Sequence, residues 1–434
     1  MKHLTFIIVL IAAIFSGCKS KSDDSVPAEQ QGKLVSHPSG IKIVSVKGTY
    51  FEMGKQYGTL MKADLQKWAK YYDSTWKSDN PVVYNYITKI IFEAGNSLFM
   101  SPKIKDFLDG AVVTSGLTRA NIYLLDMCLS FDYMFSSKIP LKSGAGCTFI
   151  GAFGTATGGH SIIGRNLDLQ RPLAVRDYNS VITIMHPTNG DHNIATFGFV
   201  GFPQGYGMLN LDNSVFTEYN TGNSADIWTD PLPGSRTMMD VAFDAITEKT
   251  NTNAATTAEF LKSRPLLSPT FFGVADKSIV LVVQRPISAT GIITQNSLAT
   301  GINGVTNVFL DSLINGVKLH IYNSDSSANG YIDKKDTPGR GMVRWVHIEK
   351  YFAAHPAPVD INSIKTIISK NIADGGVFIT GYEVEGTNSY CQQDATFGSL
   401  VIDLNDLTQV WWLRYDYASQ NKTWDHVDMT QYLE

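Results

Sequence analysis

The sequence is poor in the residues that build metal centres. It holds only four cysteines in 434 residues, and no two of them form a Cys-x-x-Cys pair. Structural zinc sites use closely spaced ligands of this kind, so the cysteine pattern argues against one. The nine histidines form no His-Glu-x-x-His motif, which leaves a catalytic metal without support as well. We therefore predict a protein that uses no metal and no other cofactor.

Charge of one sign is also scarce. The formal net charge is −4, and charged residues make up 18% of the chain. A nucleic-acid partner requires a basic surface, so none is predicted. Long apolar runs are equally rare, because the single candidate, Leu4 to Phe15, is too short for a comfortable membrane span. With 44% hydrophobic residues, the chain as a whole has the composition of a globular protein.

The N-terminal residues 1–18 resemble a bacterial lipoprotein signal peptide. A basic start and the apolar run lead to Ser16-Gly17-Cys18, where small residues precede a cysteine. In such a signal Cys18 becomes the lipidated first residue of the mature protein. Residues 19–40 then form a flexible tether, because their first part is too polar to bury a core.

This interpretation predicts a location in the bacterial cell envelope. The protein would be held to a membrane through its lipid alone and would face the periplasm or the cell exterior. Two alternatives stay open at Cys18, namely a plain signal peptide with an incidental cysteine and an uncleaved anchor. Of the other cysteines, Cys128 and Cys391 could form a disulfide in this compartment, although Cys128 lies in an apolar helical pattern typical of a core position.

Hydrophobic periodicity divides the remaining chain into two parts. Residues 41–46 have the pattern of a strand, and apolar residues then recur at helical spacing between about 51 and 134. From residue 147 onward strand patterns dominate, interrupted by helix pairs. We expect a mostly helical N-terminal segment over residues 41–146 and a second unit over residues 147–434. The pattern by itself indicates an α/β or α+β fold.

The pattern richest in chemistry begins at Cys147. This residue heads a predicted strand directly after Gly146, and four glycines between residues 151 and 159 mark a tight reversal into the next strand. That strand contains Gly-Arg-Asn-x-Asp, so the hairpin returns Arg165 and Asp168 towards Cys147. A guanidinium beside a thiol favours the thiolate, which is the nucleophilic form.

The hairpin carries one geometric condition. Residues three apart in a regular strand face opposite sides, so Arg165 and Asp168 reach Cys147 together only if the strand ends or twists before Asp168. The plain interpretations stay open too. Cys147 would then be a buried strand cysteine, and the other two would form a surface ion pair of little energetic value.

The Cys-Thr…Gly-Arg-Asn-x-Asp pattern resembles the N-terminal-nucleophile (Ntn) cysteine hydrolases, in particular the isopenicillin N acyltransferase, choloylglycine hydrolase and acid ceramidase families. Three further segments resemble these families in the same order: residues 48–58 a propeptide opening, residues 217–220 a strand with an oxyanion asparagine, and residues 305–307 a Thr-Asn step. The resemblance implies a four-layer αββα sandwich. It also implies that the chain is cut between Gly146 and Cys147.

The resemblance assigns roles within the hairpin. Cys147 would be the nucleophile, and its freed α-amino group, with a pKa of about 7.7–8.0, would be the base. Arg165 would hold the thiolate and a polar part of the substrate, and Asp168 would orient the amine. Because the amine replaces a histidine, no histidine partner is required.

Three more residues belong to the implied catalytic set. Asn220 would donate to the oxyanion, Asn307 would stand at the Thr-Asn step, and Arg344 would reach the site from a helix. Without the resemblance, Asn220 and Asn307 are ordinary turn asparagines and Arg344 is a solvated helix arginine. Arg340 competes with Arg344 for the same match.

The implied activity is that of an amidohydrolase or acyltransferase acting on a linear, non-peptide amide. Penicillin-like amides, bile-salt conjugates, N-acyl lipids and acylated amino acids all fit, and the N-terminal segment would stay bound after cleavage. One rival is a catalytically idle lipoprotein that binds a lipid or peptide in the same cleft. Another is an uncleaved hydrolase in which His160 serves Cys147 as base, although the sequence offers no clear residue to orient that histidine.

Overall fold

The computed structural model describes residues 32–79, 99–126, 146–170, 180–222, 234–295, 299–306, 313–315, 317–318, 340–356, 358–371, 374–378, 394–416 and 421–433. Two large β-sheets dominate them. The first sheet has the strand order β1 (Lys33–Ser36), β2 (Lys42–Gly48), β5 (Ser180–Pro187), β6 (Ile194–Phe199), β7 (Gly207–Asn210), β8 (Val215–Thr221), β9 (Thr270–Ala275), β10 (Val280–Arg285) and β11 (Ile292–Thr294). Strands β2 and β5 run parallel, and the other neighbours in this sheet are antiparallel.

The second sheet is antiparallel throughout. Its order is β12 (Ile302–Val305), β3 (Gly146–Phe153), β4 (Ser161–Gln170), β15 (Asp394–Asp403), β16 (Val410–Asp416) and β17 (Asn421–Val427). A short hairpin of β13 (Leu313–Ile314) and β14 (Val317–Lys318) stands apart.

The two large sheets pack face to face, and their inner faces form the core. Phe149 of β3 stacks on Phe216 of β8 with ring centroids 6.4 Å apart. Gly151 gives Val280 room to approach, because a side-chain carbon placed at Gly151 would lie 2.5 Å from the valine methyl. Close-packed apolar contacts of this kind supply most of the stability of a sandwich.

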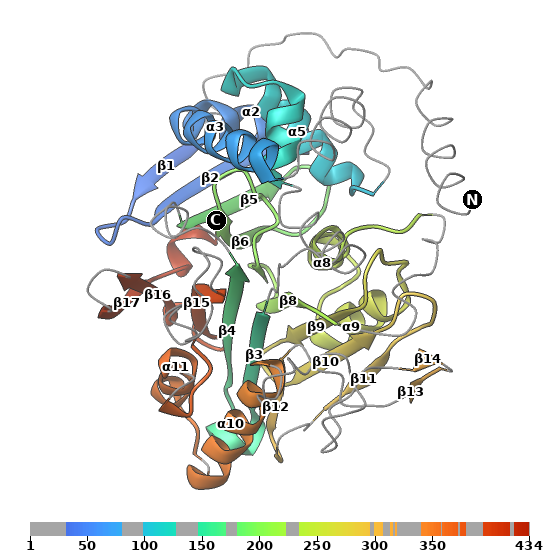
Figure 1. Ribbon diagram of the computed structural model, residues 1–434, viewed down its shortest axis with the longest axis vertical. Helices are drawn as coiled ribbons and strands as arrows, with labels where there is room; N and C mark the ends of the chain where they lie inside the picture. Colours follow the sequence, from blue (N-terminus) through green and yellow to red (C-terminus); the bar gives the residue numbers. More distant parts are fainter. Residues whose placement is uncertain are drawn as a thin grey trace.

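Helices cover both outer faces (Figure 1). The first sheet carries α8 (Met238–Thr247), α9 (Ala254–Ser263) and the N-terminal helices α2 (Tyr50–Leu60), α3 (Lys62–Asp79) and α5 (Pro102–Ser115). The second sheet carries α10 (Arg340–Ala354) and α11 (Ile361–Ser369). This layering confirms the predicted αββα sandwich.

The motif at residues 48–58 joins the N-terminal helices to the first sheet. Gly48 ends β2 with a φ of +133°, a conformation that favours glycine. Thr49 then caps α2 in a capping box with Glu52. Gln56 holds the helix to the strand, because its side chain donates to the carbonyl of Lys47 at 2.7 Å and accepts from its amide at 3.1 Å.

Glycines allow α2 and α5 to touch through their backbones. A side chain at Gly54 would lie 1.9 Å from the carbonyl oxygen of Phe107, and one at Gly110 would lie 2.1 Å from that of Phe51. Helix α5 begins with Ser101 as N-cap and proline at its first position, and it ends at Gly116 in the left-handed region, both of which are common at helix ends.

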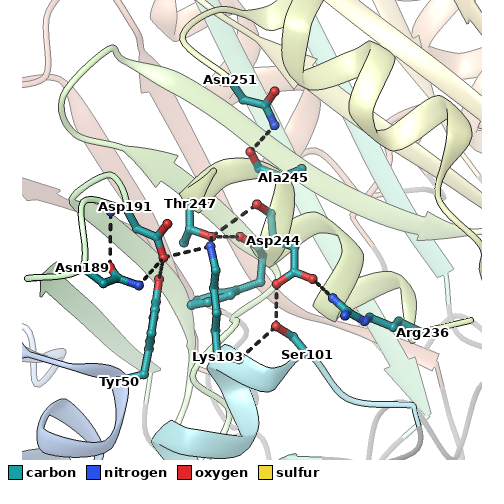
Figure 2. Close-up of polar contacts among 11 residues, drawn as sticks. Tyr50, Ser101, Lys103, Asn189, Asp191, Arg236, Asp244, Ala245, Thr247 and Asn251 are labelled. Atoms are coloured by element: carbon teal, nitrogen blue, oxygen red, sulfur yellow. Dashed lines mark hydrogen bonds and ion pairs between the residues drawn. The ribbon is translucent and has the colours of Figure 1, made fainter. Parts of the chain in front are cut away.

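Polar contacts fix the same helices to the body of the protein (Figure 2). Tyr50 of α2 donates to Asp191 at 2.9 Å, and Lys103 of α5 pairs with the same carboxylate at 2.8 Å. Ser101 donates to Asp244 of α8, which also pairs with Arg236. The N-terminal segment is therefore attached by a shared sheet and by a charge-balanced cluster.

The structure changes one predicted boundary. Residues 33–36, expected to belong to the tether over 19–40, form β1 and pair with β2. The alternation of Lys33, Leu34, Val35 and Ser36 is weak, which explains why their strand was not predicted from the pattern. Cys18, Cys128 and Cys391, with their predicted lipidation, core and disulfide roles, lie outside the described residues.

Candidate active site

Cys147 lies in β3 with its thiol directed between the two sheets. In the β3–β4 ladder Cys147 is opposite Leu167, and Phe149 is opposite Arg165. Residues directly opposite each other share a face, so the thiol and the guanidinium both point towards the first sheet. The side chain of Cys147 is 1% exposed, and Arg165 is fully buried.

Arg165 connects Cys147 in the second sheet to strand β8 in the first sheet. One terminal nitrogen donates to the Cys147 sulfur at 3.2 Å and to the carbonyl of Tyr219 at 2.8 Å. Its Nε forms an ion pair with Glu218 of β8 at 2.9 Å and lies 3.5 Å from the carbonyl oxygen of Tyr206. The sequence placed Arg165 beside Cys147, and the structure brings these two groups into direct contact.

The thiol is not as easily ionised as the neighbouring arginine suggested. Burial raises the pKa of the Cys147 thiol, because the thiolate loses more hydration than it regains. The Arg165 guanidinium lowers it and offsets part of this effect, while Asp168 and Glu218 raise it further. In the uncut chain the thiol form is therefore favoured, which corrects the expectation from sequence.

Glu218 is a residue of the site that sequence reasoning missed. It is fully buried and accepts from the amide of Gly273 at 2.8 Å besides pairing with Arg165. Burial raises the pKa of Glu218 to about 7, although Arg165 and Gly273 both favour its charged form. A signal existed, because a glutamate inside an otherwise uncharged strand must find a partner in the core.

Asp168 reaches the site by a different route from the one predicted. Strand β4 neither ends nor turns before it but continues to Gln170, so Asp168 faces away from the thiol. It lies opposite Gly146 in the ladder. The alternation of the strand thus sends Arg165 to the sulfur and Asp168 to the outer side of the backbone at the Gly146–Cys147 bond.

Arg344 of α10 connects Asp168 to that backbone. One of its terminal nitrogens lies 2.9 Å from the Asp168 carboxylate, 2.6 Å from the carbonyl oxygen of Cys147 and 2.7 Å from the hydroxyl of Thr148. Arg344 is 1% exposed, so it is not the solvated helix arginine of the plain interpretation. Two buried arginines, Arg165 and Arg344, thus pair with two buried carboxyl groups, Glu218 and Asp168.

Thr396 of β15 supports the other oxygen of Asp168. Its hydroxyl donates to Asp168 Oδ1 at 2.7 Å. The two residues are opposite each other in the ladder, immediately before an irregularity between Thr396 and Gly398. Sequence reasoning did not find this residue, because nothing near it along the chain marks a site.

Asn220 has the features of an unused hydrogen-bond donor. It is two residues after Glu218 in β8, so its side chain shares the face that meets Arg165. The side chain is fully buried, and neither amide atom has a hydrogen-bond partner among the described residues. An unpaired buried amide costs stability, so Asn220 is a candidate for the oxyanion donor that the sequence predicts.

Two other predicted residues stand differently. Asn307 lies outside the described residues, although Thr306 beside it is buried. His160 precedes β4 at the far end of the hairpin, where Phe153 is opposite Ser161, and its ring contacts Asp403 at 2.7 Å. This position separates it from Cys147 by the length of the hairpin, so His160 cannot act as its base.

The described part of the chain shows no group of three or more His, Cys, Asp or Glu side chains placed to bind a metal ion. Nor does any helix within the described ranges have the length and apolarity needed to cross a bilayer.

Comparison with known proteins finds a distant structural likeness. No family model matches the sequence, and no curated protein matches it. Among solved structures, the chain is similar to the Caenorhabditis elegans N-acylethanolamine-hydrolyzing acid amidase (NAAA) ortholog, at 14% sequence identity and a TM-score of 0.39. The likeness covers 63% of this chain and 96% of the other. At this distance it assigns no activity to this chain.

Proposed function

We propose that this chain is an Ntn-type cysteine amidohydrolase or acyltransferase that activates itself by cleavage before Cys147. The observation that carries the proposal is that buried arginines contact Cys147 from both faces of its sheet. The Cys147 sulfur receives a hydrogen bond from Arg165 on one side of the sheet, and on the other side Arg344, which pairs with Asp168, donates to the Cys147 carbonyl oxygen. A purely structural cysteine has no need of two buried arginines.

Cleavage would proceed by attack of the Cys147 sulfur on the carbonyl carbon of Gly146. The peptide C–N bond breaks, the nitrogen takes up the thiol proton, and a thioester joins Gly146 to the sulfur. Water then hydrolyses the thioester, which leaves a carboxylate on Gly146 and a free amine and thiol on Cys147. The new amine lies next to Gly146, which is opposite Asp168 in the ladder, and Arg344 and Thr396 hold the Asp168 carboxylate in place.

Turnover would use the same groups on an external amide. The neutral amine takes the thiol proton, and Arg165 stabilises the thiolate. The sulfur attacks the amide carbonyl, and the buried Asn220 amide donates to the oxyanion that develops. Collapse returns the proton to the leaving amine and gives an acyl-thioenzyme, which water or a second amine then resolves.

The proposal extends to the surroundings of the enzyme. The substrate is a small linear amide, such as an acyl amino acid, an N-acyl lipid, a bile-salt-like or a β-lactam-like compound. The N-terminal segment stays bound as a second chain, which is supported by the pairing of β2 with β5 along seven residues. Anchoring through Cys18 would place the enzyme in the bacterial cell envelope.

Intact-mass analysis of the purified protein tests the proposal. Two chains should appear, with the larger beginning at Cys147, and Cys147→Ala should remain whole and inactive. Cys128→Ala is the matched control and should be cut and active. A wild-type preparation that hydrolyses amides as a single uncut chain would overturn the proposal. An uncut, inactive chain that binds acyl compounds would instead favour the idle lipoprotein, and screening an acyl-amide library with cut protein would identify the substrate.

A further inference from the structure

The loop between β6 and β7, residues 200–206, lies between the N-terminal segment and the candidate active site. Two glycines with positive φ shape it, Gly201 at 80° and Gly205 at 64°. A side chain at Gly205 would lie 2.5 Å from the carbonyl oxygen of Phe197, so the loop presses directly on β6. It has little room to move unless one of its attachments is lost.

Residues of the N-terminal segment hold the first half of this loop. The amide of Gly201 donates to the hydroxyl of Tyr57 of α2 at 2.9 Å. Leu125 packs on the same glycine, since a side-chain carbon at Gly201 would lie 2.8 Å from its Cβ. Tyr57 and Leu125 are 1% and 2% exposed, so water does not substitute for either contact.

The second half of the loop contacts Tyr219 and Arg165. The hydroxyl of Tyr219 donates to the carbonyl of Gly205 at 2.7 Å, and the carbonyl oxygen of Tyr206 lies 3.5 Å from Arg165 Nε. Arg165 in turn donates to the carbonyl of Tyr219 and to the Cys147 sulfur. A continuous series of contacts thus leads from Tyr57 to the thiol.

We infer that Tyr57 is a positioning residue for Cys147, because it fixes the loop that sets the orientation of Arg165. The N-terminal segment then helps to orient the side chains of the active site, in addition to being bound to the rest of the protein. The effect on reactivity rests on the proposed role of Cys147, whereas the hold of Tyr57 on the loop does not.

The same helix supplies a matched control. Tyr50 lies two turns before Tyr57 in α2, is also buried, and also binds the body of the protein through its hydroxyl. Its partner is Asp191, in the cluster with Lys103 and Thr247 (Figure 2). The Tyr50 hydroxyl donates to this carboxylate, whereas the Tyr57 hydroxyl accepts from a backbone amide. Replacing Tyr50 with phenylalanine therefore removes a hydroxyl contact of α2 that does not involve the loop.

Hydrogen exchange measured by mass spectrometry tests the first step. Tyr57→Phe should increase deuterium uptake in peptides that cover residues 199–206, whereas Tyr50→Phe should leave that uptake at the wild-type level. If Tyr57→Phe fails to fold, Leu125→Val weakens the same attachment and should give the same local increase. Equal uptake over the loop in the Tyr57 and Tyr50 variants would overturn the inference.

The second step is read from the ultraviolet absorbance of the Cys147 thiolate as pH is varied, with Cys147→Ser as the reference. Arg165, Glu218 and Tyr219 are the titratable groups on the thiol side, and Asp168 and Arg344 lie on the other face of the strand; all five remain in Tyr57→Phe and Tyr50→Phe. A loosened Arg165 should raise the midpoint in Tyr57→Phe by on the order of half a pH unit, part of the one to three units that an adjacent opposite charge is worth. Increased hydrogen exchange in the loop with an unchanged thiolate midpoint would show that Tyr57 has only a structural role and would overturn the inference.

Neither measurement requires cleavage of the chain. A negative result in either one can therefore be told apart from an uncut wild-type chain, which would refute the proposed function.

Discussion

Arg344 and Asp168 are 176 residues apart in the chain and form a buried ion pair 2.9 Å long at the candidate cleavage site. The same nitrogen of Arg344 reaches the carbonyl oxygen of Cys147. Removing one member of a buried pair leaves the other charge uncompensated, at a cost of about 3–5 kcal/mol. The position of Asp168 is therefore better tested through a neutral neighbour.

Thr396 is that neighbour. Thr396→Val keeps the shape of the side chain but removes the hydroxyl that donates to Asp168 Oδ1. A hydrogen bond to a charged group is worth about 1.5–3 kcal/mol, so self-cleavage and amide hydrolysis should slow by roughly ten- to a hundredfold. Rates from denaturing gels and from product release would measure this. Thr396→Ser, which retains the hydroxyl, should recover most of the loss, and equal rates in the two variants would contradict the role.

Asn220→Ala should reduce turnover without reducing stability. Loss of an oxyanion donor costs roughly 100–1000-fold in rate. Because the Asn220 amide has no partner among the described residues, its removal should leave the melting temperature unchanged or higher. Asn303 is the contrasting case, since its buried amide donates to the carbonyls of Val280 and Thr294. Asn303→Ala should lose about 1–3 kcal/mol of unfolding free energy. A large stability loss in Asn220→Ala would show that its amide is structural.

Glu218 should make folding stability depend on pH. Its pKa is raised from 4.5 to about 7 by burial, so between these values the folded protein retains a proton that the unfolded chain has released. Its stabilising contribution is fully present below pH 4.5 and is lost as pH rises through about 7. Glu218→Gln should give a flatter profile of melting temperature over this window. The exposed Glu259 on α9 provides the control, and Glu259→Gln should reproduce the wild-type slope. A slope that survives in Glu218→Gln would contradict the assignment.

Cys18→Ser should release the protein from membranes or block its maturation. The expectation follows from the apolar run that ends in Ser16-Gly17-Cys18, because a lipidated cysteine carrying several acyl chains anchors firmly. Cell fractionation would measure it, with hydrolysis by the purified domain as the control that should not change. A fully processed variant that stays with the membranes as tightly as the parent would exclude lipid anchoring.

The sequence predicted what is close along the chain. Cys147 and Arg165 are 18 positions apart, and the glycines of the turn between them determine the hairpin that brings them together. The αββα layers were implied by resemblance and are present. The alternation rule gave the opposite faces of Arg165 and Asp168, and the condition for both to reach the thiol is not met, because β4 continues to Gln170. Both faces of β4 serve the site, because Arg344 approaches the outer one.

Contacts over long separations could not be predicted from local patterns. Thr396 is 228 positions from Asp168, and only the pairing of β15 with β4 brings them together. The net pKa of Cys147 also depended on burial, which a list of neighbours in sequence does not give. Glu218 differs from these, because its position in an apolar strand was visible and its pairing with Arg165 was the missing fact.

The parallel pairing of β2 with β5 joins residues that the proposed cut would place on two separate chains, and this would change how the protein refolds. Before cleavage, one chain supplies both strands, and refolding does not depend on protein concentration. After the proposed cut, unfolding separates two polypeptides that must find each other again, so refolding becomes a bimolecular reaction. The mature enzyme would then owe its persistence to a slow unfolding rate, and heat inactivation would be irreversible in dilute solution.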